Sequence, residues 1–328
     1  MSASVSADLS AGPAAAVLDI APLADGLLFG VTVSGLSRPD LARDEVRGAL
    51  FDLWIEKGVL LFRGCEDSPE MHVELSKCFG PLERQYFKES WVEGQPELTE
   101  IIYDPDDGNC YEVDGELIGG LLPWHSDAAY APSINRGGVL KPITLSEHGG
   151  RTGFIDQIAA YEALPDRLKA EIEGLHVVYS VDPNIVNAKF VRPKDIRFVH
   201  GCKAFMSIAR REYQYPRVLH PMVFEQPETG RKVLNLSPWF AQGVYEKSGP
   251  EGDALIREIV AICTDESQSH FHDWRMGDMM LWDNWRTLHC STGCPAHERR
   301  LMHRTTIAGD YALGRKLDGA EALPKFDM

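Results

Sequence analysis

Short hydrophobic runs, separated by glycine, proline and polar turn residues, dominate this chain. Residues 59–63 (VLLFR) form a compact apolar run that is typical of a buried strand. Residues 18–35 alternate apolar runs with turn residues and also predict strands. Beyond residue 123 the predicted strands are 138–147, 152–156, 175–181, 217–224, 232–236, 270–274, 279–283 and 301–309. Many short strands with such turns are typical of a β-sandwich or barrel.

Helical spacing of the hydrophobic positions is confined to a few stretches. Residues 41–56 place Val46, Leu50 and Trp54 on one face, and Gly58 ends the pattern. The other stretches expected to be helical are 68–80, 157–174 and 251–263. The pattern therefore predicts a mainly β fold with flanking helices, in a single domain over residues 17–328.

Two segments do not follow these patterns. Residues 1–16 are rich in Ser, Ala and Gly, and we expect them to be disordered. Residues 84–122 include YDPDDGNCYEVDGELIGG, and this content of Asp and Gly predicts an irregular, mobile segment. We expect it to act as a lid over an active site, and a surface loop without a role is the alternative.

Charge and cysteine content narrow the classes of function. There are 33 Lys and Arg residues against 49 Asp and Glu residues, a formal net charge of −16. Such a surface repels nucleic acids and anionic membranes, so we expect neither as a partner. Seven scattered cysteines without a CxxC pair, and no secretory signal, predict reduced thiols in a cytoplasmic protein.

A His-x-Asp pair and a later histidine are the main candidates for metal ligands. His125 and Asp127 in PWHSD are two residues apart, and two such side chains share one face of a strand. His289 in WDNWRTLHCSTG is expected near the end of a second core strand. Two histidines and a carboxylate hold one face of a ferrous ion and leave three positions open. The same ligands also suit zinc.

A hydroxyl and a guanidinium are the candidates for binding an anion. If residues 300–308 form a strand, Arg300 and Arg304 share a face that excludes Arg299. A guanidinium binds a carboxylate through two parallel hydrogen bonds, and Thr152 can donate a hydrogen bond to the same group. A salt bridge from Arg300 to Glu298 is the structural alternative. Beside a three-ligand metal site, this pair favours iron with 2-oxoglutarate over zinc.

Several longer motifs surround these residues. They are GVLLFRG (58–64), FGPLERQ (79–85), WHSD (124–127), GGRTGF (149–154), AAYEALP (159–165), HP (220–221), LWDN (281–284) and RRLMHRTTIAGD (299–310). In this order, from about residue 25 to residue 311, the chain resembles the taurine dioxygenase and 2,4-dichlorophenoxyacetate dioxygenase family of Fe(II)- and 2-oxoglutarate-dependent enzymes. The resemblance implies a double-stranded β-helix (jelly-roll) core.

The resemblance also implies roles for individual residues. The implied Fe(II) ligands are His125, Asp127 and His289. Thr152 and Arg300 would bind the distal carboxylate of 2-oxoglutarate, and Arg304 would bind the acidic group of the primary substrate. The implied reaction uses O2 to hydroxylate the substrate and gives succinate and CO2, with cleavage or desaturation as further outcomes.

The chain departs from the family pattern on the substrate side. Arg151 stands where relatives often carry an acidic residue, and Gln85 and Lys88 lie where a histidine and a tyrosine are expected. The segment before His125 is long and ends in apolar IGGLLPW. These departures predict a small organic substrate that is acidic, partly apolar and larger than taurine. A zinc-dependent hydrolase and a non-catalytic jelly-roll binding protein are the alternatives, and association into a homo-oligomer is left open.

Overall fold

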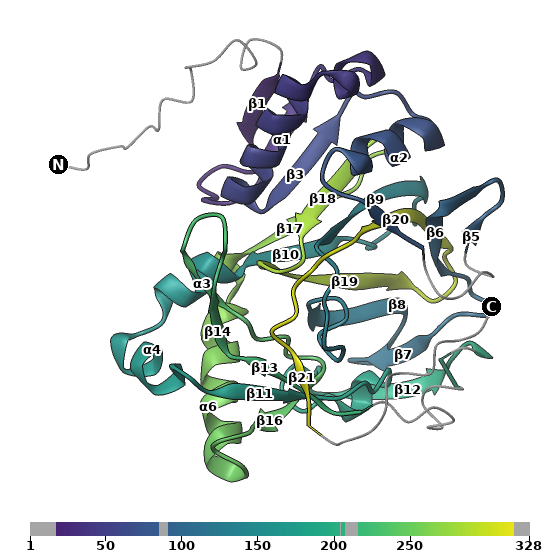
Figure 1. Cartoon of the computed structure of the whole chain (residues 1–328). Coiled ribbons are helices and arrows are strands. Elements are labelled where there is room, and N and C mark those ends of the chain that lie inside the picture. Colours follow the sequence, from purple (N-terminus) through teal and green to yellow (C-terminus); the bar gives the residue numbers. More distant parts are fainter. Residues whose placement is uncertain (1–17, 85–90, 204, 207–215, 318–328) are drawn as a thin grey trace.

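Two β-sheets with helices outside them form the core of the protein (Figure 1). The computed structural model describes residues 18–84, 91–203, 205–206 and 216–317. The predicted mainly β fold with flanking helices is confirmed, and its two sheets face one another as in a jelly roll. The segment 1–16, expected to be disordered, lies outside the described residues.

The larger sheet is antiparallel except for one pair of strands. Its order in the described part is β1-β2-β3-β18-β9-β20-β6-β5, with β4 also paired to β20, and β2 and β3 run parallel. The strands are β1 (Asp19–Pro22), β2 (Val31–Ser34), β3 (Val59–Arg63), β4 (Leu82–Glu83), β5 (Trp91–Val92), β6 (Gln95–Tyr103), β9 (Gly137–Thr144), β18 (Met279–Asp283) and β20 (Arg300–Ile307).

The smaller sheet is antiparallel, with the order β12-β7-β8-β19-β10-β17. Its strands are β7 (Cys110–Val113), β8 (Glu116–His125), β10 (Thr152–Asp156), β12 (Ile196–His200), β17 (Ser269–His272) and β19 (Thr287–Pro295). His289 lies opposite His125 on one side and opposite Phe154 on the other. Because directly opposite residues point to the same face, these three side chains share one face of the sheet.

Alternation along the strands of the larger sheet separates its two faces. Leu60 and Phe62 of β3 pack with α1 (Asp44–Lys57) and α2 (Pro69–Lys77). Leu61, between them, belongs instead to an inner layer. That layer also contains Met280 and Trp282 of β18, Met302 of β20, and Phe154 from the smaller sheet. The inner layer between the sheets is therefore the same space that His125 and His289 face.

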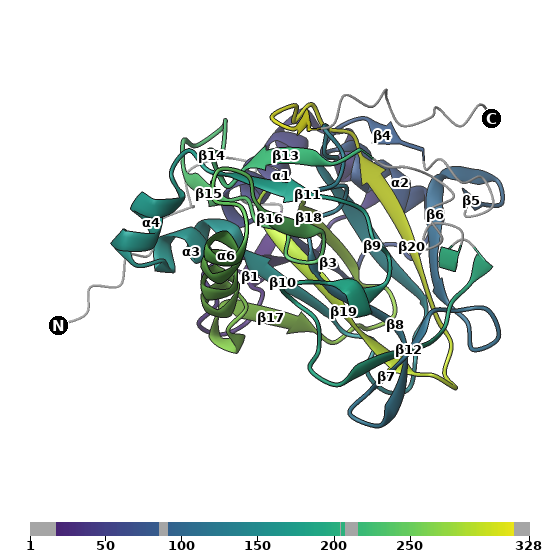
Figure 2. The ribbon, with the colours of Figure 1, turned by 90° about the horizontal axis from the view of Figure 1, so that it is seen from below.

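A third group of elements packs on the outer face of the smaller sheet. It comprises β11 (His176–Tyr179), β13 (Val218–Pro221), β14 (Val223–Glu225), β15 (Lys232–Leu234), β16 (Ala241–Val244), β21 (Arg315–Lys316), α3 (Gln157–Ala163), α4 (Asp166–Ile172) and α6 (Pro250–Cys263). Figures 1 and 2 both place α6 beside β16. The 3-10 helices are η1 (Arg38–Ala42), η3 (Ile185–Asn187) and η4 (Glu266–Gln268). None of the described helices is long and apolar enough to cross a membrane.

The helical stretch predicted near 157–174 is confirmed, but the structure divides it into two helices, α3 and α4. α3 ends at Ala163, and Leu164 is extended, with ψ of 139°. Pro165 follows, and proline both lacks a backbone N–H and disfavours helical backbone at the residue before it.

The irregular segment predicted over 84–122 is also wrong for its described part. Residues 91–122 contain β5, β6, β7 and most of β8, and β8 pairs with the site-bearing strand β19. Gly108 and Gly119 in this segment allow close packing, because a Cβ at either position would collide with the ring of Tyr103. Residues 85–90 lie outside the described part, so the lid, like the single-domain assignment, stays a prediction.

Candidate active site

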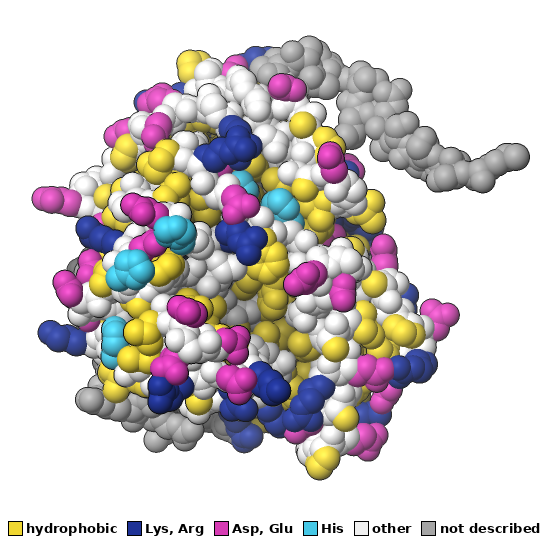
Figure 3. All heavy atoms as spheres, turned by 180° about the vertical axis from the view of Figure 1, so that it is seen from behind, with side chains coloured by type: hydrophobic (Ala, Val, Ile, Leu, Met, Phe, Trp, Pro, Cys, Tyr) yellow, Lys and Arg dark blue, Asp and Glu magenta, His cyan; other side chains and the backbone are white. Residues whose placement is uncertain are grey.

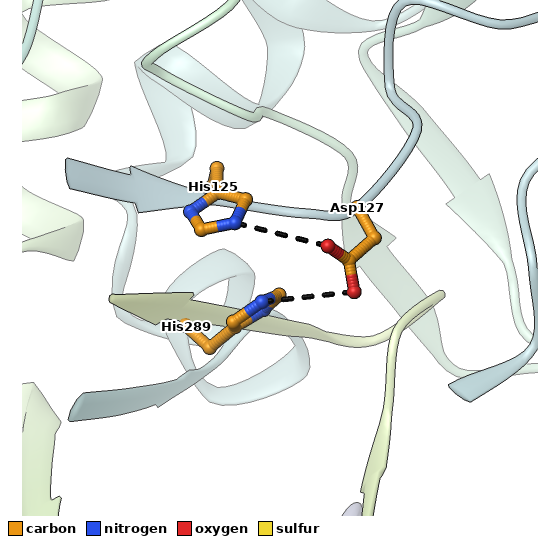
Figure 4. Close-up of side chains that lie close together, drawn as sticks. All are labelled: His125, Asp127 and His289. Carbon is orange, nitrogen blue, oxygen red and sulfur yellow. Dashed lines mark ion pairs between the residues drawn. The ribbon is translucent and has the colours of Figure 1, made fainter. Parts of the chain in front are cut away.

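His125, Asp127 and His289 converge between the two sheets (Figure 4). One ligand atom from each lies within 4.8 Å of the other two. The Nε2 atom of His125 is 3.8 Å from Oδ1 of Asp127, and Nε2 of His289 is 3.7 Å from Oδ2. The two imidazole rings lie 4.2 Å apart between centroids. Two ring nitrogens and a carboxylate are therefore grouped around one point, as a metal site requires.

The backbone around Asp127 does not follow the strand geometry predicted for the His-x-Asp pair. β8 ends at His125, and Ala128 has a positive φ of 56°, so Asp127 lies in a turn. Asn284 fixes this turn from a distant segment. Its Oδ1 accepts a hydrogen bond from the Asp127 N–H (2.8 Å), and its Nδ2 donates to the Asp127 carbonyl (3.0 Å). His289 lies near the start of β19, whereas we predicted the end of a core strand.

Both histidines are neutral. Nδ1 of His125 donates a hydrogen bond to the carbonyl of Pro123 (2.7 Å), which leaves the lone pair on Nε2, toward Asp127. Burial lowers the pKa of His125, and it lowers the pKa of His289 to about 3. At neutral pH each ring can therefore offer Nε2 to a metal ion.

Arg304 forms an ion pair with the carboxylate of Asp127. Its Nη1 and Nη2 donate to Oδ1 (3.3 Å) and Oδ2 (2.6 Å). Burial disfavours the charged carboxylate, yet the Arg304 guanidinium holds the pKa of Asp127 well below its usual range. The guanidinium also lies over the ring of Trp282 (5.1 Å), which in turn lies 5.0 Å from the ring of His289. Arg304 thus stands directly beside the three-residue group.

Arg300 is buried without such a partner. Its side chain is on the same strand face as Arg304, it is 8% exposed, and its Nε and Nη2 have no hydrogen-bond partner within the described residues. Burial lowers its pKa to about 10. The alternative partner, Glu298, instead accepts from Nδ1 of His148 (2.7 Å). The neighbouring Arg299 is exposed and pairs with Asp104 (3.3 Å), so the predicted difference between the two arginines is confirmed.

Thr152 lies at the same end of the interior as Arg300. It shares the inner face of β10 with Phe154, two residues further on. Gly150, two residues before Thr152, has a φ of +69°, and a Cβ there would lie 3.2 Å from Cδ of Arg300. Arg300 and Arg304 are about 13 Å apart along β20 at the usual rise of a strand. The buried guanidinium without a partner and the His-Asp-His group therefore occupy different ends of one space.

The chain matches the model of the Taurine catabolism dioxygenase TauD, TfdA family over residues 19–306. It belongs to this family. It is 31% identical over 300 residues to an (S)-phenoxypropionate/alpha-ketoglutarate-dioxygenase of Sphingobium herbicidovorans, with 90% of this chain and 96% of that protein covered. It is 30% identical over 293 residues to an alpha-ketoglutarate-dependent 2,4-dichlorophenoxyacetate dioxygenase of Cupriavidus pinatubonensis, with 86% and 96% covered.

The fold is similar to that of AAD-2 in complex with Mn(II) and N-oxalylglycine. The TM-score is 0.68 at 25% identity, over 90% of this chain and 99% of AAD-2. This TauD/TfdA-family protein is thus an Fe(II)- and 2-oxoglutarate-dependent dioxygenase. The predicted family, jelly-roll fold and cofactors (Fe(II), 2-oxoglutarate and O2) are confirmed. Neither the zinc hydrolase nor the non-catalytic binding protein is favoured.

Two residues of this TauD/TfdA-family site had no role in the sequence predictions. Asn284, which holds the turn at Asp127, lies in the quoted LWDN motif, so a signal was present. Trp274 donates from Nε1 to Oγ1 of Thr152 (3.0 Å), and the sequence placed it only at the end of a strand. Of the tryptophans on β8 and β18, Trp282 contacts His289, whereas Trp124 packs on Phe271 (5.6 Å) with the outer cluster.

Proposed function

We propose that this dioxygenase hydroxylates a small, acidic and partly apolar molecule at an Fe(II) ion bound by His125, Asp127 and His289. The convergence of these three side chains, two of them neutral imidazoles, carries the proposal. Neutral nitrogens and one carboxylate suit Fe(II), and a set of three leaves coordination positions for other ligands. The family membership of the chain favours iron over zinc at this site.

Arg300 and Thr152 bind the distal carboxylate of 2-oxoglutarate in this proposal. A buried guanidinium without a partner among the described residues is costly, and a carboxylate relieves that cost through charge-assisted hydrogen bonds. Thr152 adds a hydroxyl donor from the facing sheet. With its distal end held there, the co-substrate extends toward the His-Asp-His group.

Fe(II), 2-oxoglutarate and O2 supply the oxidation of a C–H bond and yield succinate and CO2. The protein positions the reactants and limits access of water. The site residues are mostly buried, with His125 5% exposed and His289 9% exposed. An aromatic wall adjoins them, because the rings of Trp239 and Phe240 lie 5.2 Å and 6.0 Å from that of His125. This wall supports a substrate with an apolar part.

Arg304 binds the acidic group of the substrate in this proposal, next to the metal. The charges of the interior support a single negative charge on that substrate. The charges of Asp127 and Arg304 cancel, and so do those of Fe(II) and dianionic 2-oxoglutarate. The positive charge of Arg300 then remains as the net charge of the loaded site. The names of the two relatives above, which refer to phenoxypropionate and 2,4-dichlorophenoxyacetate, fit one carboxylate on an apolar group.

The molecular surface fits this substrate class better than a polymer. Acidic and basic side chains are interspersed on the face in Figure 3, and hydrophobic side chains gather around a hollow near its centre. With an aryloxy acid, a hydroxyl introduced beside the ether oxygen would give an unstable product that fragments. Hydroxylation would then appear as cleavage into a phenol and a 2-oxo acid.

Succinate formation by the Fe(II)-loaded protein tests this function. The protein is supplied with 2-oxoglutarate and O2, and with aryloxy acids, other carboxylates, sulfonates or alkyl sulfates in turn. We expect one aryloxy or similar monoanionic acid to stimulate succinate release strongly. Stimulation by neutral compounds alone would overturn the assignment of an acidic substrate. Absence of succinate under every condition, with zinc retained in place of iron, would favour the hydrolase instead.

A further inference from the structure

The hydroxyl group of Thr152 has one hydrogen-bond partner among the described residues, the indole of Trp274. An indole N–H can only donate, whereas a hydroxyl has one hydrogen to donate and two lone pairs to accept. Trp274 therefore occupies a lone pair of Thr152 Oγ1 at 3.0 Å and leaves the hydroxyl hydrogen free. A hydroxyl anchored in this way can donate only away from the indole.

The position of Trp274 is itself fixed by a network centred on the buried carboxylate of Asp278. Its ring packs against the inner layer between the sheets. Asp278, which is 1% exposed, accepts from Arg63 Nε (2.8 Å) and Nη2 (2.9 Å), from His272 Nε2 (3.0 Å) and from the Arg275 N–H (3.1 Å). The ring of His272 meets that of Trp274 edge-on at 4.8 Å. The loop that carries the indole is thus held at both ends.

Arg300 passes close to the segment that carries Thr152. The Arg300 side chain passes the backbone of Gly150, two residues before Thr152, and its Nε and Nη2 have no partner among the described residues. A carboxylate that reaches these nitrogens is an acceptor for the free hydroxyl hydrogen as well. Thr152 and Arg300 bind this carboxylate together only if the Thr152 hydroxyl hydrogen points toward it.

We propose that Trp274 is a positioning residue that orients the Thr152 hydroxyl toward the distal carboxylate of 2-oxoglutarate. This inference rests on the proposed role of Thr152. Without the indole N–H, the hydroxyl hydrogen rotates among several directions and the bound co-substrate loses an oriented donor. The effect therefore concerns binding of the co-substrate more than the rate of the chemical step.

Trp274→Phe tests this role because it keeps an aromatic ring and removes the N–H. N-oxalylglycine, titrated into the Mn(II)-loaded protein, reports binding without turnover. We expect about three- to tenfold weaker binding, the range for loss of one hydrogen bond. The KM for 2-oxoglutarate should rise by a similar factor while kcat changes less than twofold. Unchanged binding of N-oxalylglycine would overturn the proposal.

Trp285→Phe is a matched control. It removes another tryptophan N–H, which donates to the Ile134 carbonyl (3.0 Å) in a separate buried cluster. We expect it to lower stability without weakening N-oxalylglycine binding. Trp274→His keeps a ring N–H, so it should bind N-oxalylglycine more tightly than Trp274→Phe does. If Trp274→Phe does not fold, Trp274→His and Trp274→Met provide the same comparison, and equal binding by these two would contradict the inference.

A double-mutant cycle with Thr152→Val separates this inference from the proposed function. Thr152→Val should weaken N-oxalylglycine binding about tenfold or more, since the lost hydrogen bond is to a charged group. If Trp274 acts through Thr152, the double variant binds no more weakly than Thr152→Val alone. If the double variant instead binds N-oxalylglycine more weakly, by the product of the two single effects, the role of Trp274 is refuted and that of Thr152 is left intact. No effect of Thr152→Val would instead refute the role of Thr152.

Discussion

Replacement of Arg300 by methionine is predicted to abolish most co-substrate binding without destabilising the unliganded protein. Arg300 is 8% exposed, and burial lowers the pKa of its guanidinium to about 10. Against an ordinary pKa of about 12.5, and at 1.36 kcal/mol per pKa unit, this fall corresponds to about 3 kcal/mol. Folding incurs this cost at every pH below about 10, because the lone guanidinium stays charged. Methionine fills similar apolar space and removes the cost.

The same change removes the main attraction for the distal carboxylate. Two charge-assisted hydrogen bonds of at least about 1.5 kcal/mol each are lost, which corresponds to binding that is about 100-fold weaker or more. At a ligand concentration of about 100 times Kd, N-oxalylglycine should stabilise the unmodified protein by about 2.7 kcal/mol. At the same concentration the Arg300→Met variant should gain only about 0.4 kcal/mol.

Urea unfolding of the Mn(II)-loaded protein, with and without N-oxalylglycine, measures the stability of the unliganded protein and its stabilisation by the ligand. Arg299→Met is the control, because Arg299 is exposed and pairs with Asp104 at the surface (3.3 Å). Arg299→Met should change the unliganded stability, and the stabilisation by N-oxalylglycine, by less than about 0.5 kcal/mol each. An Arg300→Met variant that loses unliganded stability and keeps the full effect of N-oxalylglycine would refute the reasoning. Arg300 would then have a structural partner.

Three further substitutions test the metal site and the core. Asp127→Asn should weaken Mn(II) binding about 100-fold or more and abolish succinate formation, and full metal binding would exclude Asp127 as a ligand. Arg304→Gln removes a cation that competes with the metal for Asp127, so Mn(II) should bind about three- to tenfold more tightly, and weaker binding would contradict that competition. His72 is buried, and burial lowers its pKa to about 3, below the value near 6.5 in the unfolded chain. The unfolded chain therefore binds more protons below pH 6.5, and stability falls as the pH falls. Between pH 6 and pH 4, His72→Gln should reduce the pH slope of the unfolding free energy by about 1.4 kcal/mol per pH unit, and an unchanged slope would contradict this.

Local sequence patterns predicted the framework of the fold well. The strands at 59–63, 152–156 and 279–283 have the predicted bounds, because alternation and short apolar runs are local properties. The segment 91–122 was misjudged because its glycines resemble those of a loop. At Gly108 and Gly119 the actual reason is tertiary, since the ring of Tyr103 lies against both positions. No spacing rule within the segment reveals that contact.

The candidate metal ligands were predicted as a set, but for an incomplete reason. Alternation along a strand was expected to place His125 and Asp127 on one face, whereas Asp127 lies in a turn after β8. That turn is held by Asn284, 157 residues away in the sequence. The order of the motifs was sufficient to group these three residues, and the structure brings them together. The geometry itself depends on a partner that the local sequence does not contain.

Arg300 and Arg304 show what strand alternation predicts and what it does not. Strand alternation predicted that both point inward, and both do. Alternation alone does not distinguish their surroundings: Arg304 is paired with Asp127, whereas Arg300 has no acidic partner among the described residues. A buried cation without a partner destabilises the protein that contains it, so its persistence is best explained by an anion that binds there. We therefore propose that Arg300, which is costly for the unliganded fold, marks the co-substrate end of the site.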